Sequence, residues 1–230
     1  MFGVVCALDW EARCLPRQAD GLRVVVSGMG AAAAAAAARE LVEQGVRGLI
    51  DFGSAGGLDP ARQAGDLLLP ARVLNSDGAS FSADPDLHAR LAAALAAVGL
   101  SSQHAAVLEV SAALAAPADK AECRARYHRQ GVAAVDMESA AVAQVAAQAG
   151  LPFLAVRAVL DAADRRLPGD VLATVDAAGR PQAFALIAAL CRRPSLVGDL
   201  LALAVARDRA AATLRRAGIV LAAGFDPVPR

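Results

Sequence analysis

Three carboxylate side chains, which are groups able to act as general acids or bases, stand at the ends of apolar segments. Glu11, Glu138 and Asp161 each follow or end a short apolar run, and the segment 53–57, with the sequence GSAGG, follows another. In open α/β sheets, ligands bind outside the carboxyl ends of the strands. If these apolar runs are strands of one sheet, all four elements lie along the same edge and form a binding site.

Each of these acids also has an ordinary structural interpretation. A carboxylate after a strand more often caps the next helix than catalyses a reaction. Glu138 in particular opens a predicted helix, where the positive end of the helix dipole favours a negative charge. The coincidence of three acids and a glycine-rich segment at one sheet edge is what favours a site over helix capping.

The rest of the sequence alternates short apolar runs with longer alanine-rich runs, which predicts strands joined by helices. The predicted strands are 2–8, 22–28, 46–53, 65–75, 104–110, 132–137 and 152–161. The predicted helices are 31–45, 84–99, 117–131 and 138–150, with a helical tail in two pieces divided near Pro194. Strands that are apolar throughout, with helices between them, indicate an α/β sheet covered on both faces. Because no linker interrupts the pattern, residues 1–230 are expected to form one domain with a helical C-terminal extension from about residue 180.

The composition excludes several classes of protein. Of the 230 residues, 57% are hydrophobic and 20% are charged, which excludes a disordered chain. The net charge is zero and aromatic residues make up 3%, so the charge and the stacking platforms of a nucleic-acid-binding protein are missing. The four cysteines are scattered, so neither a metal site nor a disulfide framework is expected. Reduced thiols and a start without a signal peptide favour a cytoplasmic protein.

One segment imitates a dinucleotide-binding fingerprint. The sequence GMGAAA at 28–33 follows a predicted strand and opens a helix, and Asp51 ends the next predicted strand. The strand before this segment is not the first of the fold, however, and a second glycine-rich segment follows at 53–57. We therefore expect no nicotinamide and no other cofactor.

Three segments carry a resemblance to a known family. They are SGMGAAAAAAA (27–37), DFGSAGGLDPARQAGDLLLP (51–70) and VDMESAAVAQVAAQAGLPFLAVRAVLDAAD (135–164). They resemble the nucleoside phosphorylase and nucleosidase superfamily, and within it the methylthioadenosine/S-adenosylhomocysteine nucleosidases. The continuation to residue 204 is similar to a narrower group, the hopanoid-associated nucleosidases, often labelled phosphorylases. The resemblance implies a three-layer α/β/α sandwich around a mixed central sheet, and a homodimer.

The resemblance also implies roles for individual residues. Glu11 matches the acid that orients and deprotonates the attacking water, and Asp161 matches the acid that helps to protonate the purine at N7. Glu138 matches the acid that binds the ribose hydroxyls, and Met137 matches the residue that packs on the ribose. The nucleophile end of the pocket is lined by Ser54, Ala55 and Gly56.

The reaction that the resemblance implies explains these residue types. Cleavage of an N-glycosidic bond passes through an oxocarbenium-like cation, and a purine leaves poorly as an anion. Protonation of the base by a carboxylic acid contributes ~10²–10⁴-fold to the rate. Asp161 suits this role if desolvation raises its pKa, which its apolar flanks favour. The reaction needs no metal ion.

Two positions depart from the family pattern. Leu160 stands where relatives often have Ser immediately before the catalytic Asp, which removes a hydroxyl that orients the acid or the base. The segment 111–118 reads SAALAAPA, where relatives place an aromatic side chain that stacks on the purine. The residues that clamp the base are therefore unassigned, and adenine is the expected base on the resemblance alone.

Water is the favoured nucleophile, and two alternatives stay open. A phosphorylase holds a phosphate dianion, normally with arginines, and phosphorolytic relatives have an arginine where this chain has Asp51. Arg13 lies near the other possible phosphate position, but it is as readily a surface residue. A nucleoside-binding protein without turnover is the second alternative, and the retention of all three acids speaks against it.

The expected partner is a small molecule, a purine nucleoside with a hydrophobic 5′ substituent such as adenosylhopane of hopanoid biosynthesis. Residues 195–218 predict an amphipathic helix with several arginines on or near it. This helix either packs on the protein body with its arginines in solvent or touches a membrane that carries a lipid substrate.

Overall fold

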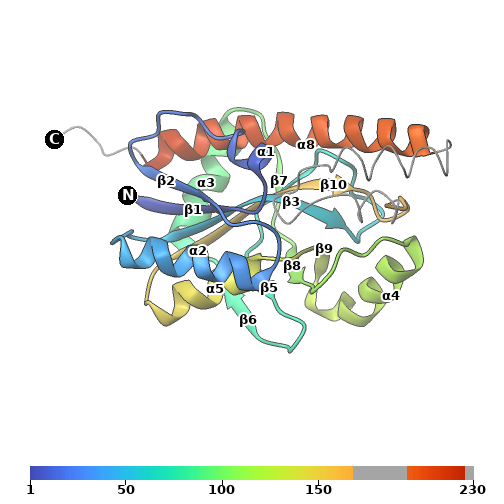
Figure 1. The fold of residues 1–230 in the computed structure, drawn as a ribbon, viewed down its shortest axis with the longest axis horizontal. Coiled ribbons are helices and arrows are strands. Elements are labelled where there is room, and N and C mark those ends of the chain that lie inside the picture. The colour runs from blue at the N-terminus through green and yellow to red at the C-terminus, as the bar shows by residue number, and fades with distance from the viewer. Residues whose placement is uncertain (168–195, 226–230) are drawn as a thin grey trace.

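The computed structural model describes residues 1–167 and 196–225, in which a mixed β-sheet carries helices on both faces (Figure 1). The strands are β1 (Phe2–Cys6), β2 (Leu22–Val26), β3 (Leu49–Gly57), β4 (Leu67–Leu68), β5 (Arg72–Leu74), β6 (Ser80–Ser82), β7 (Ser102–Gln103), β8 (Ala106–Glu109), β9 (Val132–Asp136) and β10 (Phe153–Asp161). The helices are α1 (Asp9–Ala12), α2 (Ala31–Glu43), α3 (Pro85–Ala97), α4 (Pro117–Tyr127), α5 (Ser139–Gln148) and α8 (Leu196–Phe225), with a 3-10 turn, η1 (His128–Gln130), after α4.

Strand β3 is the centre of the sheet, because it is long enough to have three neighbours. On one side it pairs in parallel with β10 along its whole length. On the other side, its first half pairs in parallel with β1, and its end pairs in antiparallel with β9, where Val135 lies opposite Gly56. The carboxyl ends of β1 and β9 therefore point toward each other beside the middle of β3.

This topology corrects the predicted location of the site. The four polar elements were expected at one outer edge, which requires all the strands to run in the same direction. β9 runs opposite to β3, so the residues after it approach the residues after β1 from the other side. The polar elements do meet, but at a gap in the interior of the sheet. The strand pattern of the sequence carries no information about this direction.

Helices cover both faces of the sheet, as the alternation of strands and helices predicted. Helices α1, α3 and α8 share one apolar cluster with the sheet, and α2 and α5 share another. In Figure 1, α8 runs along the upper side of the sheet while α2 and α5 lie below it. This three-layer α/β/α arrangement around a mixed sheet confirms the predicted fold class.

The glycine-rich segment 53–57 belongs to β3, whereas the sequence analysis placed it after the predicted strand 46–53. A Cβ atom on Gly53 would lie 2.7 Å from Arg157 Nη1 and 2.8 Å from the Glu11 carboxylate carbon. Glycine at this position therefore lets two charged side chains approach the strand backbone. Pairing with β10 and β9 keeps the segment extended although glycine has a weak preference for strands.

Other boundaries also differ from the predicted ones. The predicted strand 65–75 forms two short strands, β4 and β5, and the predicted helix 117–131 ends at Tyr127. The short strands β6 and β7 were not predicted. Of the predicted helical tail, the part before Pro194 lies outside the described residues, and α8 begins just after this proline.

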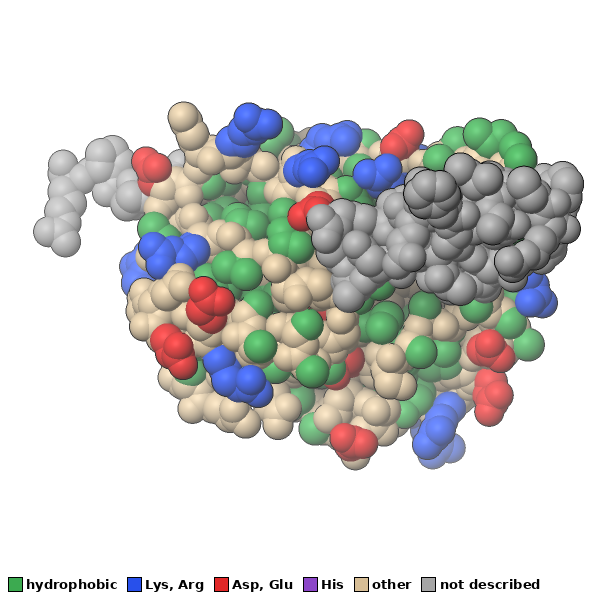
Figure 2. Space-filling view, viewed as in Figure 1, with side chains coloured by type: hydrophobic (Ala, Val, Ile, Leu, Met, Phe, Trp, Pro, Cys, Tyr) green, Lys and Arg blue, Asp and Glu red, His purple; other side chains and the backbone are tan. Residues whose placement is uncertain are grey.

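Helix α8 buries one side and exposes the other. Ala210, Leu214 and Leu221 are buried against the body of the protein, whereas Leu201 is 64% exposed. None of the helices in residues 1–167 and 196–225 is long and apolar enough to cross a bilayer. Figure 2 shows basic and acidic side chains scattered over one face of the molecule, so neither sign of charge covers that face.

Candidate active site

A cleft of about 280 Å³ lies where the ends of β1 and β9 meet beside β3. All seven candidate residues line it: Glu11, Ser54, Ala55, Gly56, Met137, Glu138 and Asp161. They come from four separate parts of the chain, so only the fold brings them together.

Glu11 is buried at one end of the cleft and held there by three neutral donors. Its Oε1 accepts hydrogen bonds from the Ser54 amide at 2.8 Å and the Ser54 hydroxyl at 2.7 Å. Its Oε2 accepts from the Leu8 amide at 3.0 Å, at the start of α1. Burial raises the pKa of Glu11, although the Arg157 charge and these hydrogen bonds oppose the increase. A fixed carboxylate of raised basicity suits a general base.

Arg157 forms the charged interior behind Glu11. Its Nε donates to Asp136 at 2.8 Å, and its Nη2 pairs with Asp51. All three side chains are 1% exposed, so they form a buried ion-pair cluster under the cleft. Asp136 also accepts from the Ser139 amide at 3.2 Å, which ties the cluster to the start of α5.

Two arguments about phosphate binding change with this arrangement. Asp51 faces Arg157 and does not line the cleft, so it cannot act there as the repulsive charge that the sequence suggested. Arg13 is exposed and does not line the cleft either. Neither Asp51 nor Arg13 therefore indicates whether water or phosphate is the nucleophile.

Glu138 stands at the start of α5 without capping it. Its Oε1 accepts from the Gly30 amide at 2.7 Å and its Oε2 from the Met137 amide at 3.2 Å, and neither donor belongs to the helix. Asp136 is the side chain that bonds the helix amide. Burial raises the pKa of Glu138 to about 7, with Arg157 opposing the increase. The helix-cap interpretation of Glu138 is therefore wrong.

The same contact explains the segment that imitates a dinucleotide fingerprint. Gly30 has a φ of +99°, which favours glycine, and this conformation accompanies an amide that donates to Glu138. Met29, its neighbour, lines the cleft. The glycines at 28–33 thus shape the wall next to Glu138.

Asp161 lies at the other end of the cleft and is 6% exposed. Burial raises its pKa, and the Lys120 ammonium opposes the increase. A Cβ atom on Gly56 would lie 3.4 Å from Asp161 Oδ1, so the glycine leaves space in front of the carboxylate. This environment suits an acid that faces a bound molecule.

The model of the phosphorylase superfamily matches residues 18–192. The chain belongs to this superfamily. A curated relative, the 5′-methylthioadenosine/S-adenosylhomocysteine nucleosidase of Anoxybacillus flavithermus, is 32% identical over 164 residues, which cover 64% of this chain and 71% of the relative. The family predicted from the three sequence segments is confirmed. Glu11 precedes the matched residues, so its place in the site rests on the contacts described above.

Solved structures of the superfamily share this fold. The nucleosidase of Colwellia psychrerythraea, in complex with adenine, aligns with a TM-score of 0.72 at 20% identity, over 99% of this chain and 97% of that chain. The nucleosidase of Neisseria meningitidis, in complex with methylthio-immucillin-A, aligns with a TM-score of 0.69 at 20% identity, over 96% and 98%. At this identity the alignments establish the architecture and leave the roles of side chains to the contacts in this chain.

Lys120 lines the cleft and was missed by the sequence analysis. It lies on α4, is 1% exposed, and pairs through Nζ with Asp161 Oδ2. One signal was available in the sequence, because Lys120 is the only lysine in a chain with 22 arginines. No local pattern connects residue 120 with residue 161, so the pair itself was not predictable.

The remaining wall of the cleft is mostly apolar. Ala113 and Leu114 represent the segment in which an aromatic side chain was sought, and Leu160 also lines the cleft. The only tryptophan of the chain, Trp10, lines it as well, with the Arg207 guanidinium 5.5 Å from its ring centre. The sequence analysis missed Trp10 because it sought an aromatic residue in the segment 111–118. Trp10 is a candidate to contact the substrate.

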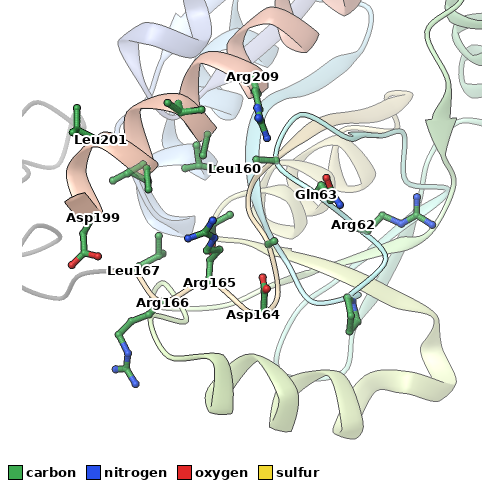
Figure 3. Close-up of a pocket in the computed structure, with 18 residues that line it drawn as sticks. Arg62, Gln63, Leu160, Asp164, Arg165, Arg166, Leu167, Asp199, Leu201 and Arg209 are labelled. Carbon is green, nitrogen blue, oxygen red and sulfur yellow. The ribbon is translucent and has the colours of Figure 1, made fainter. Parts of the chain in front are cut away.

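A second cavity, of about 640 Å³, adjoins the cleft (Figure 3). The two share Leu160, Asp161, Leu167 and Leu203 as lining residues. The second cavity continues along α8 past Leu201 and Val205. Its polar wall carries charges of both signs, from four arginines (Arg62, Arg165, Arg166 and Arg209) and three aspartates (Asp161, Asp164 and Asp199).

Proposed function

We propose that this protein hydrolyses the N-glycosidic bond of a purine nucleoside, as its nucleosidase relative does by name. The observation that carries the proposal is the fixed position of Glu11. Three neutral donors orient its carboxylate at one end of the cleft, and Glu138 and Asp161 line the same cleft. A binding protein without turnover needs no oriented carboxylate of raised pKa at this position.

Each acid has one step in the proposed reaction. Glu11 takes a proton from water as the oxygen bonds to C1′ of the ribose. Glu138 binds ribose hydroxyls and stabilises the positive charge that develops on the sugar, while Met137 packs on the ring. The C1′–N9 bond breaks, its electron pair goes to the purine, and N7 receives a proton through Asp161.

Water fits the nucleophile end better than phosphate does. Glu11 is an anion there when it acts as a base, and Arg157 behind it is paired with Asp51 and Asp136. Phosphorolysis is the second candidate, and one observation favours it. Arg207 lines the cleft above Trp10 without an ion pair among the described residues, so it could contact an anion.

The proposed substrate carries a large apolar group at its 5′ position, with adenosylhopane as the specific hypothesis. The apolar wall of the cleft and the adjoining cavity support this choice. Leu203 lines both cavities, and Leu201 continues the apolar surface along α8. A nucleoside alone would leave this surface unused.

The experiment that tests the proposed activity is a purine-release assay in phosphate-free buffer. Adenosine, 5′-methylthioadenosine and 5′-octylthioadenosine serve as probes. We expect free purine and free sugar, with kcat/KM increasing along the series because each buried methylene contributes about 0.8 kcal/mol. Failure of all three probes would refute the nucleosidase, and a flat series would refute the apolar subsite alone.

A matched pair of variants locates the apolar subsite. Leu203→Asp places a charge where both cavities are lined, and we expect it to remove the advantage of the octyl probe. Ile219→Asp makes the same change at a position on α8 that is 61% exposed and lines neither cavity. Equal effects of the two variants would show that the loss has a structural origin.

A further inference from the structure

Lys120 and Arg157 are the only basic side chains in the described residues that are buried, and each is 1% exposed. Arg157 lies under the cleft in its ion-pair cluster, whereas Lys120 lines the cleft. The chain uses arginine for all its other side-chain cations. A lysine can release a proton at accessible pH and an arginine does not. The lysine at this position can therefore act as a proton donor, which an arginine could not.

The Lys120 ammonium has an acceptor for each of its three N–H bonds. Nζ donates to Asp161 Oδ2, to the Ala162 carbonyl at 2.8 Å and to the Arg165 carbonyl at 3.1 Å. A neutral lysine has two N–H bonds and one lone pair. The two carbonyls accept these two N–H bonds, and the lone pair then faces Asp161. The site therefore satisfies both protonation states of the lysine.

We propose that Lys120 is the positioning residue that supplies, through Asp161, the proton taken up by the leaving purine. This inference rests on the proposed nucleosidase function and extends it. A proton moves from Lys120 Nζ to the Asp161 carboxylate and on to N7 as the C1′–N9 electron pair goes to the purine. Lys120 is left neutral, Glu11 holds the proton from water, and exchange with solvent restores both groups after the products leave.

The charge of Lys120 affects whether Asp161 carries a proton. Beside an ammonium a carboxylate is favoured in its ionised form, in which it has no proton to donate. Burial raises the pKa of Asp161 while Lys120 opposes the increase, so the removal of Lys120 raises the pKa of Asp161 further. Without Lys120, Asp161 must carry its own proton, and activity should then be confined to pH values below its pKa.

The other charged groups around the pair do not replace Lys120. Glu11 and Glu138 line the same cleft, Arg207 and Arg209 reach the two cavities from α8, and Arg165 follows in the adjacent loop. Lys120 is the charged group that shifts the pKa of Asp161. Glu138 titrates near pH 7 in its own right, but it is present in both the wild type and a Lys120 variant. A comparison of the two pH profiles therefore removes its contribution.

The test is the pH profile of kcat for the wild type and Lys120→Met, with 5′-methylthioadenosine as the probe. We expect kcat of the variant to fall relative to that of the wild type as the pH rises, by ~10²-fold once Asp161 is ionised, and to approach that of the wild type as the pH is lowered. Arg124→Met removes a charge one turn further along α4, at an exposed position that lines neither cavity, and should leave the profile unchanged. A variant profile parallel to that of the wild type would overturn the proposal, because a merely structural loss lowers activity at every pH.

A second variant keeps the test decisive if Lys120→Met does not fold. Lys120→Ala leaves a space for a small amine, and we expect ethylammonium to restore activity at pH 8, while tetramethylammonium, which has no N–H, should not. Equal rescue by both ions would contradict a role in proton supply. If the wild type releases no purine from this probe, from adenosine or from 5′-octylthioadenosine, the proposed function fails; if the wild type is active and the profiles are parallel, only the role of Lys120 fails.

Discussion

The two ends of the cleft hold their carboxylates by different means. At the proposed nucleophile end, Glu11 is fixed by two amides and a hydroxyl, which are neutral. At the proposed leaving-group end, Asp161 is paired with the ammonium of Lys120. A general base has to accept a proton. Neutral donors orient its carboxylate without adding a positive charge that would lower its affinity for that proton. An acid has to give one, and a cation with an N–H bond can renew it.

Four carboxylates are buried around the single arginine Arg157, next to the cleft. Glu11, Asp51, Asp136 and Glu138 all lie near Arg157, which is the charge that lowers the pKa of three of them. Burial nevertheless raises the pKa of Glu11, Asp51 and Glu138, because one arginine cannot compensate four carboxylates in a medium of low dielectric constant. Glu138, whose pKa is raised to about 7, therefore exchanges its proton near neutral pH.

The largest effect is expected at the leaving-group end. Asp161→Asn should fold normally and lose ~10³-fold in kcat, since an amide cannot deliver a proton to the purine. The measurement is purine release, with Asp86→Asn, an exposed change on α3, as the control. Activity of Asp161→Asn within a few-fold of wild type would remove this residue from the mechanism.

A smaller loss, of ~10²-fold, is expected at the nucleophile end for Glu11→Gln. The glutamine oxygen can still accept from Ser54, although its NH2 group cannot accept from the Leu8 amide, and the basicity is lost. Asp9→Asn, a half-buried change on the same helix, is the matched control. If Glu11→Gln hydrolyses the probe as fast as Asp9→Asn does, the contrast between the two ends is lost.

The ribose position should respond in both kinetic constants. Glu138→Gln weakens recognition of the ribose hydroxyls and stabilisation of the cation, so kcat should fall at least as much as KM rises. A 2′-deoxynucleoside should be a poor substrate of the wild type. Equal cleavage of the 2′-deoxynucleoside and its parent would refute the ribose assignment.

The smallest effect is on stability, and it has the opposite sign. The folded protein raises the pKa of Glu138 to about 7, whereas an unfolded chain releases this proton near the ordinary glutamate pKa of 4.5. Stability is therefore lost as the pH rises between these values. Glu138→Gln should remove this loss and increase the free energy of unfolding at pH 8 by roughly 1–3 kcal/mol. Urea unfolding at pH 8 and pH 5 measures it, and a variant that is less stable than wild type at pH 8 would contradict the buried charge.

The sequence predicted the parts of the fold that depend on local pattern. The short apolar runs, the alanine-rich helices and the layered α/β class follow from composition and periodicity. The candidate acids were found because each stands where an apolar run ends. The direction of β9, the extended glycines of β3 and the limits of β4 and β5 depend on pairing between distant segments, which local pattern does not contain.

Parts of the site were out of reach for the same reason. Arg157 sits in the middle of an apolar strand, and its two carboxylate partners come from other strands. Asp51 was placed near the nucleophile because phosphorolytic relatives have an arginine at this position, but its side chain pairs with Arg157. Trp10 and Lys120 are each the only residue of their type, and this rarity was the one feature of the sequence that pointed to them.

The most direct test of the central claim is the identity of the product when phosphate is supplied. Wild-type protein and Glu11→Gln are incubated with 5′-methylthioadenosine, with and without saturating inorganic phosphate, and sugar and sugar 1-phosphate are separated. We predict that the wild type releases free sugar at the same rate in both buffers and that Glu11→Gln is slow in both. Purine release that depends on phosphate, with sugar 1-phosphate as the product, would contradict water as the nucleophile and Glu11 as its base.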